Sequence, residues 1–293
     1  MKKKGNQTIV FSSPPVITGY AAVVGKKEGE GPLKEYFDYI SRDDKFGEKT
    51  WEKAESRFVS ESTRTAVKKA GLEISDIEYV FCGDLLNQCT GSNYAMREFQ
   101  IPCFGLYGAC STMAESLSLA AMTIDGGYAE NTLAVTSSHF CSSERQFRFP
   151  LEYGSTRPAT SQWTVTGSGA TVVSKKGNGP EIKSVTTGKI IDLGIKDANN
   201  MGAAMAPAAL DTIIAHFNDL NRDFSQYVLI VTGDLGYLGN EILSDMLTDN
   251  GYNPEKKLTD CGMLIFDRNT QDVHSGGSGC GCSASVLASF IMH

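Results

Sequence analysis

The chain has 293 residues, of which 41% are hydrophobic and 21% charged, and it contains 30 glycines. This balance is typical of a soluble globular α/β protein and excludes a disordered chain. The formal net charge of −7, with no basic helix, argues against nucleic-acid binding. The N-terminus lacks the apolar stretch of a signal peptide, and the apolar runs are too short or interrupted to span a bilayer.

The eight cysteines show no repeated Cys-x-x-Cys pairing. This spacing indicates neither a disulfide framework nor a structural zinc site, so reduced thiols in a cytosolic setting are expected. Cys280 and Cys282 lie close to His274, but a single close cysteine pair is a weak metal-binding pattern. We therefore predict no metal and no cofactor.

The first half of the chain alternates predicted strands and helices. Apolar spacing predicts strands over 8–24, 79–82, 102–106, 131–137 and 164–173, and helices over 51–70, 92–100 and from 112 to the Gly126–Gly127 pair. Residues 25–49 are predicted to form a loop with a short helix. Gly167, Ser168 and Gly169 predict a place where the backbone closely approaches another element.

Residues 175–180 (Lys-Lys-Gly-Asn-Gly-Pro) have the composition of a linker. Beyond it we predict helices over 205–217 and 241–249, strands over 227–232 and 261–266, and a glycine-rich loop over 276–279. Both sides of the linker share an α/β rhythm. This predicts two similar halves, 1–176 and 177–293, with a site between them.

A cysteine lies where one predicted strand turns into a helix. Cys110 follows the strand over 102–106 and directly precedes the helix that begins at Thr112. Free amides and the positive end of the helix dipole at such a place favour a thiolate and can hold an anion. A lone cysteine is otherwise more often a buried structural residue, so both interpretations stay open.

The segment 51–173 resembles the N-terminal half of thiolase-fold enzymes of the ketoacyl synthase III kind, through its Gly-Ala-Cys-Ser turn at 108–111 and its Gly-x-Gly-Ala strand at 167–170. The whole chain resembles, more narrowly, the stage V sporulation protein AD family of endospore-forming bacteria. The segments that carry this likeness are 137–140, 144–150, 163–169 and 272–284. The resemblance implies a layered αβαβα thiolase fold with two similar halves.

The chain departs from the enzymes of this fold in two ways. They carry a histidine after the central strand of the second half, where this chain reads Ile-Val-Thr-Gly-Asp-Leu-Gly over 230–236. Asp234 as an anion opposes the charge that develops on an oxyanion, and one lost oxyanion donor costs a factor of about 10² to 10³. The chain also stops at residue 293, so the closing C-terminal strands are expected to be missing, or a partner to cover their place.

The resemblance implies a non-catalytic protein that binds dipicolinate (pyridine-2,6-dicarboxylate), alone or as its calcium complex, for uptake into the developing spore. A planar dianion requires amides or a guanidinium fork for its carboxylates and an apolar wall for its ring. The residues that we expect to supply these groups are Cys110, Ser111, Thr112, His139, Phe140, Arg145, Arg148, Trp163, Asp234 and Cys280.

Two other functions stay open. In the first, Cys110 carries an acyl group from coenzyme A or an acyl carrier protein, and His139 or His274 acts as the base of an active acyltransferase or condensing enzyme. In the second, the protein is only a scaffold in a membrane-associated complex. The resemblance further implies spore membrane channel proteins of the same operon as partners, a peripheral position at the spore inner membrane, and a homodimer formed through the first-half sheet.

Overall fold

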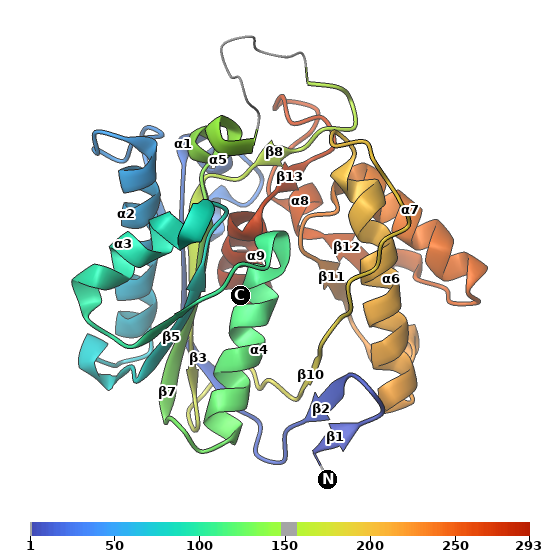
Figure 1. Cartoon of the computed structure of the whole chain (residues 1–293), viewed down its shortest axis with the longest axis horizontal. Helices are drawn as coiled ribbons and strands as arrows, with labels where there is room; N and C mark the ends of the chain where they lie inside the picture. Colours follow the sequence, from blue (N-terminus) through green and yellow to red (C-terminus); the bar gives the residue numbers. More distant parts are fainter. Residues whose placement is uncertain (1, 148–156) are drawn as a thin grey trace.

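The computed structural model describes residues 2–147 and 157–293, and its centre is a mixed β-sheet (Figure 1). Within the described residues the strand order is β4–β3–β9–β7–β5–β6. The bounds are β3 (Val16–Val24), β4 (Tyr39–Ile40), β5 (Tyr79–Gly83), β6 (Cys103–Gly105), β7 (Asn131–Ser138) and β9 (Gly167–Ser174). β5 runs parallel to both β6 and β7, whereas β9 runs antiparallel to β3 and β7.

Helices cover both faces of this sheet (Figure 1). One face carries α2 (Trp51–Lys69) and α3 (Thr90–Phe99), and the other carries α4 (Thr112–Asp125) and α9 (Cys280–Val286). Successive side chains of a strand point to opposite faces, so neighbouring residues at the end of β7 reach different layers. The Ser137 hydroxyl bonds to Glu55 of α2, whereas the Ser138 hydroxyl accepts from the Gly281 amide of α9.

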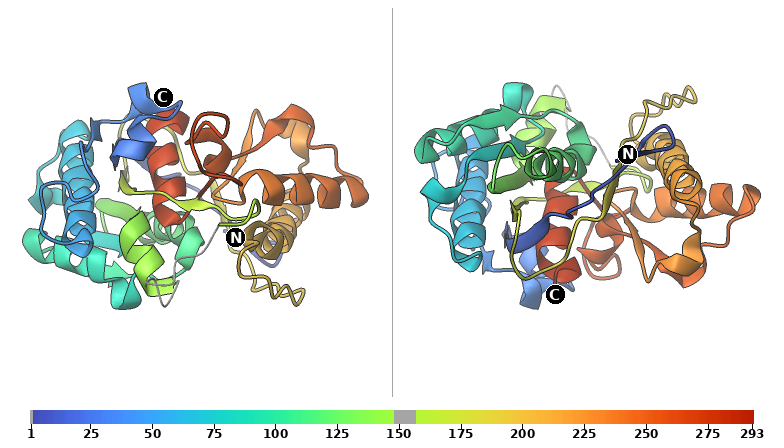
Figure 2. Two further views of the ribbon diagram at one scale, coloured as in Figure 1. Left: turned by 90° about the horizontal axis from the view of Figure 1, so that it is seen from above. Right: turned by 90° about the horizontal axis from the view of Figure 1, so that it is seen from below.

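The second half forms a lobe of its own around α6 (Met201–Leu220) and α7 (Gly236–Asp249), as the views in Figure 2 show. Phe217, Leu243 and Leu247 are buried between these helices. Beside them, β11 (Ile230–Thr232) pairs in parallel with β12 (Leu258–Asp260). β10 (Ser184–Thr186) instead joins β2 (Thr8–Val10), which also pairs with β1 (Lys3–Lys4). The division of the chain at residue 176 stays a prediction.

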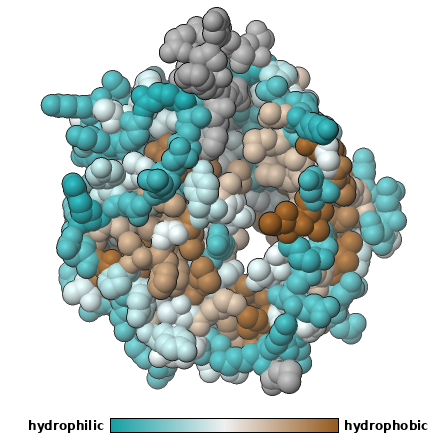
Figure 3. Space-filling view, viewed as in Figure 1, coloured by the Kyte–Doolittle hydropathy of each residue, from teal (hydrophilic) through white to brown (hydrophobic). Residues whose placement is uncertain are grey.

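A cavity of about 350 Å³ separates β10 from β11 above α6 and is lined mainly by apolar side chains. Figure 3 shows hydrophobic surface bordering an opening between the two lobes. Just before β11, Val228 is 94% exposed. No helix in residues 2–147 and 157–293 combines the length and the apolar character that crossing a membrane requires.

Most elements form where the sequence predicts them, with three differences. The expected strand over 164–173 is divided into β8 (Trp163–Thr164) and β9, which belong to different sheets. The segment 261–266, expected as a strand, contains the short helix α8 (Cys261–Leu264), because the carboxylate of Asp260 caps it by accepting the Gly262 amide at 2.8 Å. The expected strand over 8–24 is divided into β2 and β3 around Pro14 and Pro15, which cannot donate backbone hydrogen bonds. The excursion over 25–49 contains the short helix α1 (Lys26–Gly29), as expected.

The close approach predicted at the glycines of β9 is confirmed. A Cβ atom on Gly169 would lie 2.1 Å from the carbonyl oxygen of Ala284 in α9. No side chain fits at that distance, so glycine lets α9 lie directly on the sheet. This contact positions Cys280 at the start of α9.

Candidate functional site

The strand-turn-helix geometry expected around Cys110 is present. β6 ends at Gly105, a single 3₁₀ turn spans Ala109–Ser111, and α4 begins at Thr112. Ala109 has φ of 50°, a left-handed conformation that costs energy for a residue with a Cβ atom. This turn leaves Cys110 half-buried and directed at the second half of the chain, toward Asp234.

Asp234 lies against the Cys110 thiol. Its carboxyl group is buried, and its Oδ2 accepts the Gly279 amide at 2.8 Å. The backbone around it is fixed from two sides, because Gln162 Nε2 donates to the Asp234 carbonyl at 2.6 Å and Asp260 accepts the next two amides of the chain. The residue expected in place of the enzymes' histidine therefore lies beside the cysteine.

Burial raises the pKa of Cys110 well above that of a free thiol, and the Asp234 carboxylate raises it further. The sequence-based expectation of a lowered pKa is therefore wrong. The expected amide cradle is also absent in this part of the described chain, because the Ser111 amide donates to Gly108 and the Thr112 amide to Ala109 within the turn. The start of the helix favours a thiolate, but burial of the thiol and the neighbouring carboxylate outweigh that effect.

His139 does not belong to the cysteine site. It follows β7 on the α2 side of the sheet, where its ring lies near Phe58 and is fully buried. Its Nδ1 accepts the Cys141 amide at 3.2 Å, so Nε2 carries the proton and donates to the Asp44 carbonyl at 2.6 Å. Both ring nitrogens are thus engaged, and burial lowers the pKa of His139. These contacts hold the ring on the α2 side of the sheet.

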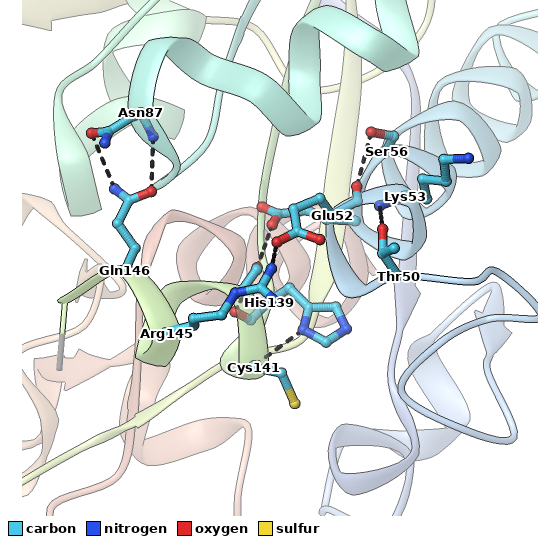
Figure 4. A network of polar contacts seen from close by, with 11 residues as sticks. Thr50, Glu52, Lys53, Ser56, Asn87, His139, Cys141, Arg145 and Gln146 are labelled. Atoms are coloured by element: carbon cyan, nitrogen blue, oxygen red, sulfur yellow. Dashed lines mark hydrogen bonds and ion pairs between the residues drawn. The ribbon is translucent and has the colours of Figure 1, made fainter. Parts of the chain in front are cut away.

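Arg145, one of the two arginines expected to clamp the ligand at Cys110, faces another element. Arg145 of α5 (Phe140–Phe147) makes an ion pair with Glu52 of α2 (Figure 4). Its guanidinium also lies over the ring of Trp51, in the same helix. The side of α5 that Arg145 occupies could not be read from its sequence. Arg148 lies outside the described residues.

The two residues expected as an aromatic wall lie against each other. Phe140 and Trp163 are stacked with ring centroids 3.7 Å apart and planes 3° from parallel. The Lys27 ammonium lies 3.7 Å from the centroid of the Trp163 ring. Trp163 begins β8 (Trp163–Thr164), which pairs with β13 (Gly277–Ser278), the strand directly before Gly279. The aromatic pair is therefore one strand away from the contact between Gly279 and Asp234.

Cys280 completes what we call the Cys110–Asp234 cluster, made of Cys110, Asp234, Gly279 and Cys280. The Cys280 thiol is buried and donates to the Ser137 carbonyl at 3.0 Å. His274, the other candidate base, instead contacts the Pro158 carbonyl at 2.7 Å and Asp272 at 3.0 Å. The cluster thus combines two thiols and a carboxylate.

Sequence reasoning missed two buried acids beside this cluster, Glu55 and Asp84. A signal for Glu55 was present, because it shares the helical stripe of Phe58, Val59 and Ser62, which all face the sheet. A charged residue within an apolar stripe of a helix indicates that a polar group in the protein interior contacts its side chain.

The chain is similar to known proteins both in sequence and in fold. The family model of stage V sporulation protein AD matches residues 5–293. Stage V sporulation protein AD of Bacillus subtilis (strain 168) is 46% identical over 291 residues, which cover 99% of this chain and 86% of that protein.

Two solved structures illustrate the fold. Cerulenin-bound OleA of Xanthomonas campestris matches with a TM-score of 0.63 at 15% identity, over 95% of this chain and 88% of that one. The 3-oxoacyl-[acyl-carrier-protein] synthase III of Aquifex aeolicus matches with a TM-score of 0.55 at 12% identity, over 94% and 89%. The layered α/β architecture is that of the thiolase and ketoacyl synthase III fold, as expected.

Proposed function

Because the chain belongs to the stage V sporulation protein AD family, and so to proteins of bacterial sporulation, we propose that it binds dipicolinate at the Cys110–Asp234 cluster for uptake into the developing spore. The observation that carries the proposal is the contact between Cys110 and Asp234. A carboxylate that holds a thiol protonated suits binding and opposes nucleophilic catalysis.

The charge of the cluster favours one form of the ligand. Asp234 brings negative charge, and Arg145 faces α2 instead of Cys110. A free dianion would be repelled there, whereas calcium bound to the ligand's own carboxylates cancels that charge. Calcium also prefers oxygen ligands such as the carboxylate of Asp234. We therefore propose that the calcium complex is the bound species.

The same contacts argue against the acyltransferase alternative. Acyl transfer to a cysteine requires a thiolate and a base within hydrogen-bond reach. Burial and Asp234 raise the pKa of Cys110, while His139 is bound to Asp44 and Cys141, and His274 to Pro158 and Asp272. In these contacts neither histidine is placed to take the proton of the Cys110 thiol.

Calorimetric titration tests the ligand. We expect calcium dipicolinate to bind at least tenfold more tightly than dipicolinate in the presence of a chelator, and benzoate, with one carboxylate, to bind weakest. Phthalate keeps the second carboxylate and should fall between them. In Asp234→Asn the preference for the calcium complex should weaken strongly, because the repelling charge is removed and a neutral amide oxygen replaces the carboxylate.

Equal binding of benzoate and calcium dipicolinate would contradict the proposal. If none of these ligands binds or raises the melting temperature, the chain is better described as a scaffold. In either case we propose the same partners, the spore membrane channel proteins of its operon, and a peripheral position at the spore inner membrane. Family resemblance supports both.

We further propose a homodimer formed through β6. Within the described residues β6 pairs with β5 alone, which leaves its other edge open. All three residues of β6 are exposed, and the side chain of Phe104 among them is 53% exposed. Tyr107, which follows the strand, is 55% exposed. An open edge strand with aromatic side chains is a ready surface for pairing with a second copy.

Phe104→Glu should convert this dimer into a monomer, because a charge on the edge strand opposes pairing with its copy. Light scattering after size exclusion measures the mass. Val228→Glu, at a 94% exposed position of the second half, is the matched control and should leave the dimer intact. A wild-type monomer, or an unchanged dimer in Phe104→Glu, would refute the β6 interface.

A further inference from the structure

Two carboxyl groups are buried together between α2 and the sheet. Glu55 of α2 and Asp84, which directly follows β5, are both fully buried. A Cβ atom placed on Gly91 would lie 3.3 Å from Cδ of Glu55 and 3.4 Å from Oδ2 of Asp84, so the two groups are neighbours in the interior and the charge of Asp84 acts on Glu55. Two negative charges so close in a dry interior are very unfavourable.

Their hydrogen bonds determine which group keeps its charge. Asp84 accepts two backbone amides, Leu86 at 2.8 Å and Ser92 at 2.7 Å. Ser92 lies in the first turn of α3, where the helix dipole also favours an anion. Glu55 instead accepts from hydroxyls, Ser137 at 3.1 Å and Ser142 at 2.9 Å. Hydroxyls serve a neutral carboxyl equally well, so Asp84 is the anion and Glu55 carries the proton.

We propose that the proton on Glu55 makes this buried pair a pH-dependent latch, which holds α5 and the segment 84–92 against α2 and loses strength as the proton is removed. Both elements are tied to the pair directly, α5 through Ser142 and the segment through Asp84. When Glu55 ionises, the second charge is tolerated only if water reaches it, and water reaches it when these elements open.

The surroundings offer no compensating cation among the described residues. α2 presents Glu55, β7 presents the Ser137 hydroxyl, α5 presents the Ser142 hydroxyl, and α9 presents the Cys280 thiol. The nearest arginine of α5, Arg145, is already paired with Glu52. Burial, with Asp84 as the next cause, raises the pKa of Glu55 to about 8.

The latch adjoins the proposed ligand site through one residue. Ser137 donates its hydroxyl to Glu55 and accepts the Cys280 thiol at its carbonyl. Opening of the latch therefore disturbs a residue that holds Cys280 in the Cys110–Asp234 cluster. This coupling to the ligand, unlike the latch itself, rests on the proposed function.

Hydrogen exchange in Glu55→Gln tests the latch. Glutamine keeps both serine contacts but has no proton to lose. In the wild type, ionisation favours the open state between the ordinary pKa of a glutamate and about 8, so opening of α5 and 84–92 should increase about tenfold per pH unit. From pH 6 to pH 8 the ratio of wild-type to Glu55→Gln opening should therefore rise about fiftyfold, because half of the closed state is already ionised at pH 8.

Glu28→Gln is the matched control, since burial also raises the pKa of Glu28 to about 8 but its carboxylate accepts the Thr166 amide instead. It should leave α5 exchange as in the wild type. An identical pH trend in Glu55→Gln and the wild type would overturn the latch. Asp84→Asn removes the neighbouring charge, so the pH range over which opening increases should end at a lower pH. If Asp84→Asn does not fold, the Glu55→Gln result alone tests the latch.

Calcium dipicolinate is titrated into the wild type and Glu55→Gln at the same two pH values. We expect affinity to fall toward pH 8 in the wild type alone. If neither protein binds dipicolinate, the proposed function fails while the exchange data still judge the latch. If both bind with the same pH profile, the coupling fails and the proposed function stands.

Discussion

Replacing Asp234 with asparagine should make Cys110 react with iodoacetamide at least tenfold faster near neutral pH. The Asp234 carboxylate raises the pKa of the neighbouring thiol, so the neutral amide lets more of Cys110 ionise. Each unit by which the pKa falls gives about ten times more thiolate while the pKa stays above the pH. Peptide mapping of partly alkylated protein measures the rate at each cysteine.

In the wild type, the exposed Cys103 should be alkylated before Cys110, which is only half-buried but lies against Asp234. Asp272→Asn removes an exposed carboxylate elsewhere and should leave the rate at Cys110 unchanged. If Cys110 of the wild type reacts first, or forms a thioester with acyl-coenzyme A, Asp234 does not keep the thiol protonated. The protein would then be a candidate acyltransferase.

Gly169→Ala should lower the free energy of unfolding by about 3 kcal/mol or prevent folding. Its Cβ would lie 2.1 Å from the carbonyl oxygen of Ala284, a backbone atom that cannot rotate away. α9 must then shift from the sheet, and Cys280 shifts with it. Urea unfolding followed by circular dichroism measures the loss.

Gly105→Ala is the control for this substitution. Gly105 also lies in a strand of the same sheet, but the atoms nearest to its Cβ position are 4.0 Å away. We expect little change there, since alanine also restricts the unfolded chain more than glycine does. Equal losses in the two variants would mean that strand propensity, and not the contact with α9, determines the effect.

The elements and the cysteine turn were predictable because their signals are local. The helical spacing of residues before Gly71 predicted α2. The turn before Thr112 predicted that Cys110 precedes a helix. The absence of the enzymes' histidine correctly directed attention to Asp234. The glycines of β9 correctly indicated a close approach, although not which helix makes it.

The electrostatics of the site could not be predicted from the sequence. The pKa of Cys110 depends on a carboxylate 124 positions later in the chain, and the local helix signal favours the opposite direction. The direction of Arg145 depends on which side of α5 faces α2, which eight residues of helix do not determine. The alternation of side chains along β7 determines on which face of the sheet His139 lies. A shift of one residue would have placed it on the face that carries α9.

The contact between α9 and the central sheet also sets the timing of assembly during synthesis. Strands β3, β5, β7 and β9 lie within residues 16–174, yet one face of the sheet that they form is covered in part by residues 280–286. Until the ribosome has released that helix, the apolar surface around Ala134 and Val173, which packs with Ala284 of α9, lacks part of its cover. Contacts between such distant segments slow folding and expose intermediates to aggregation. Synthesis of this protein should therefore depend on chaperones that protect the first half until residues 280–286 have been made.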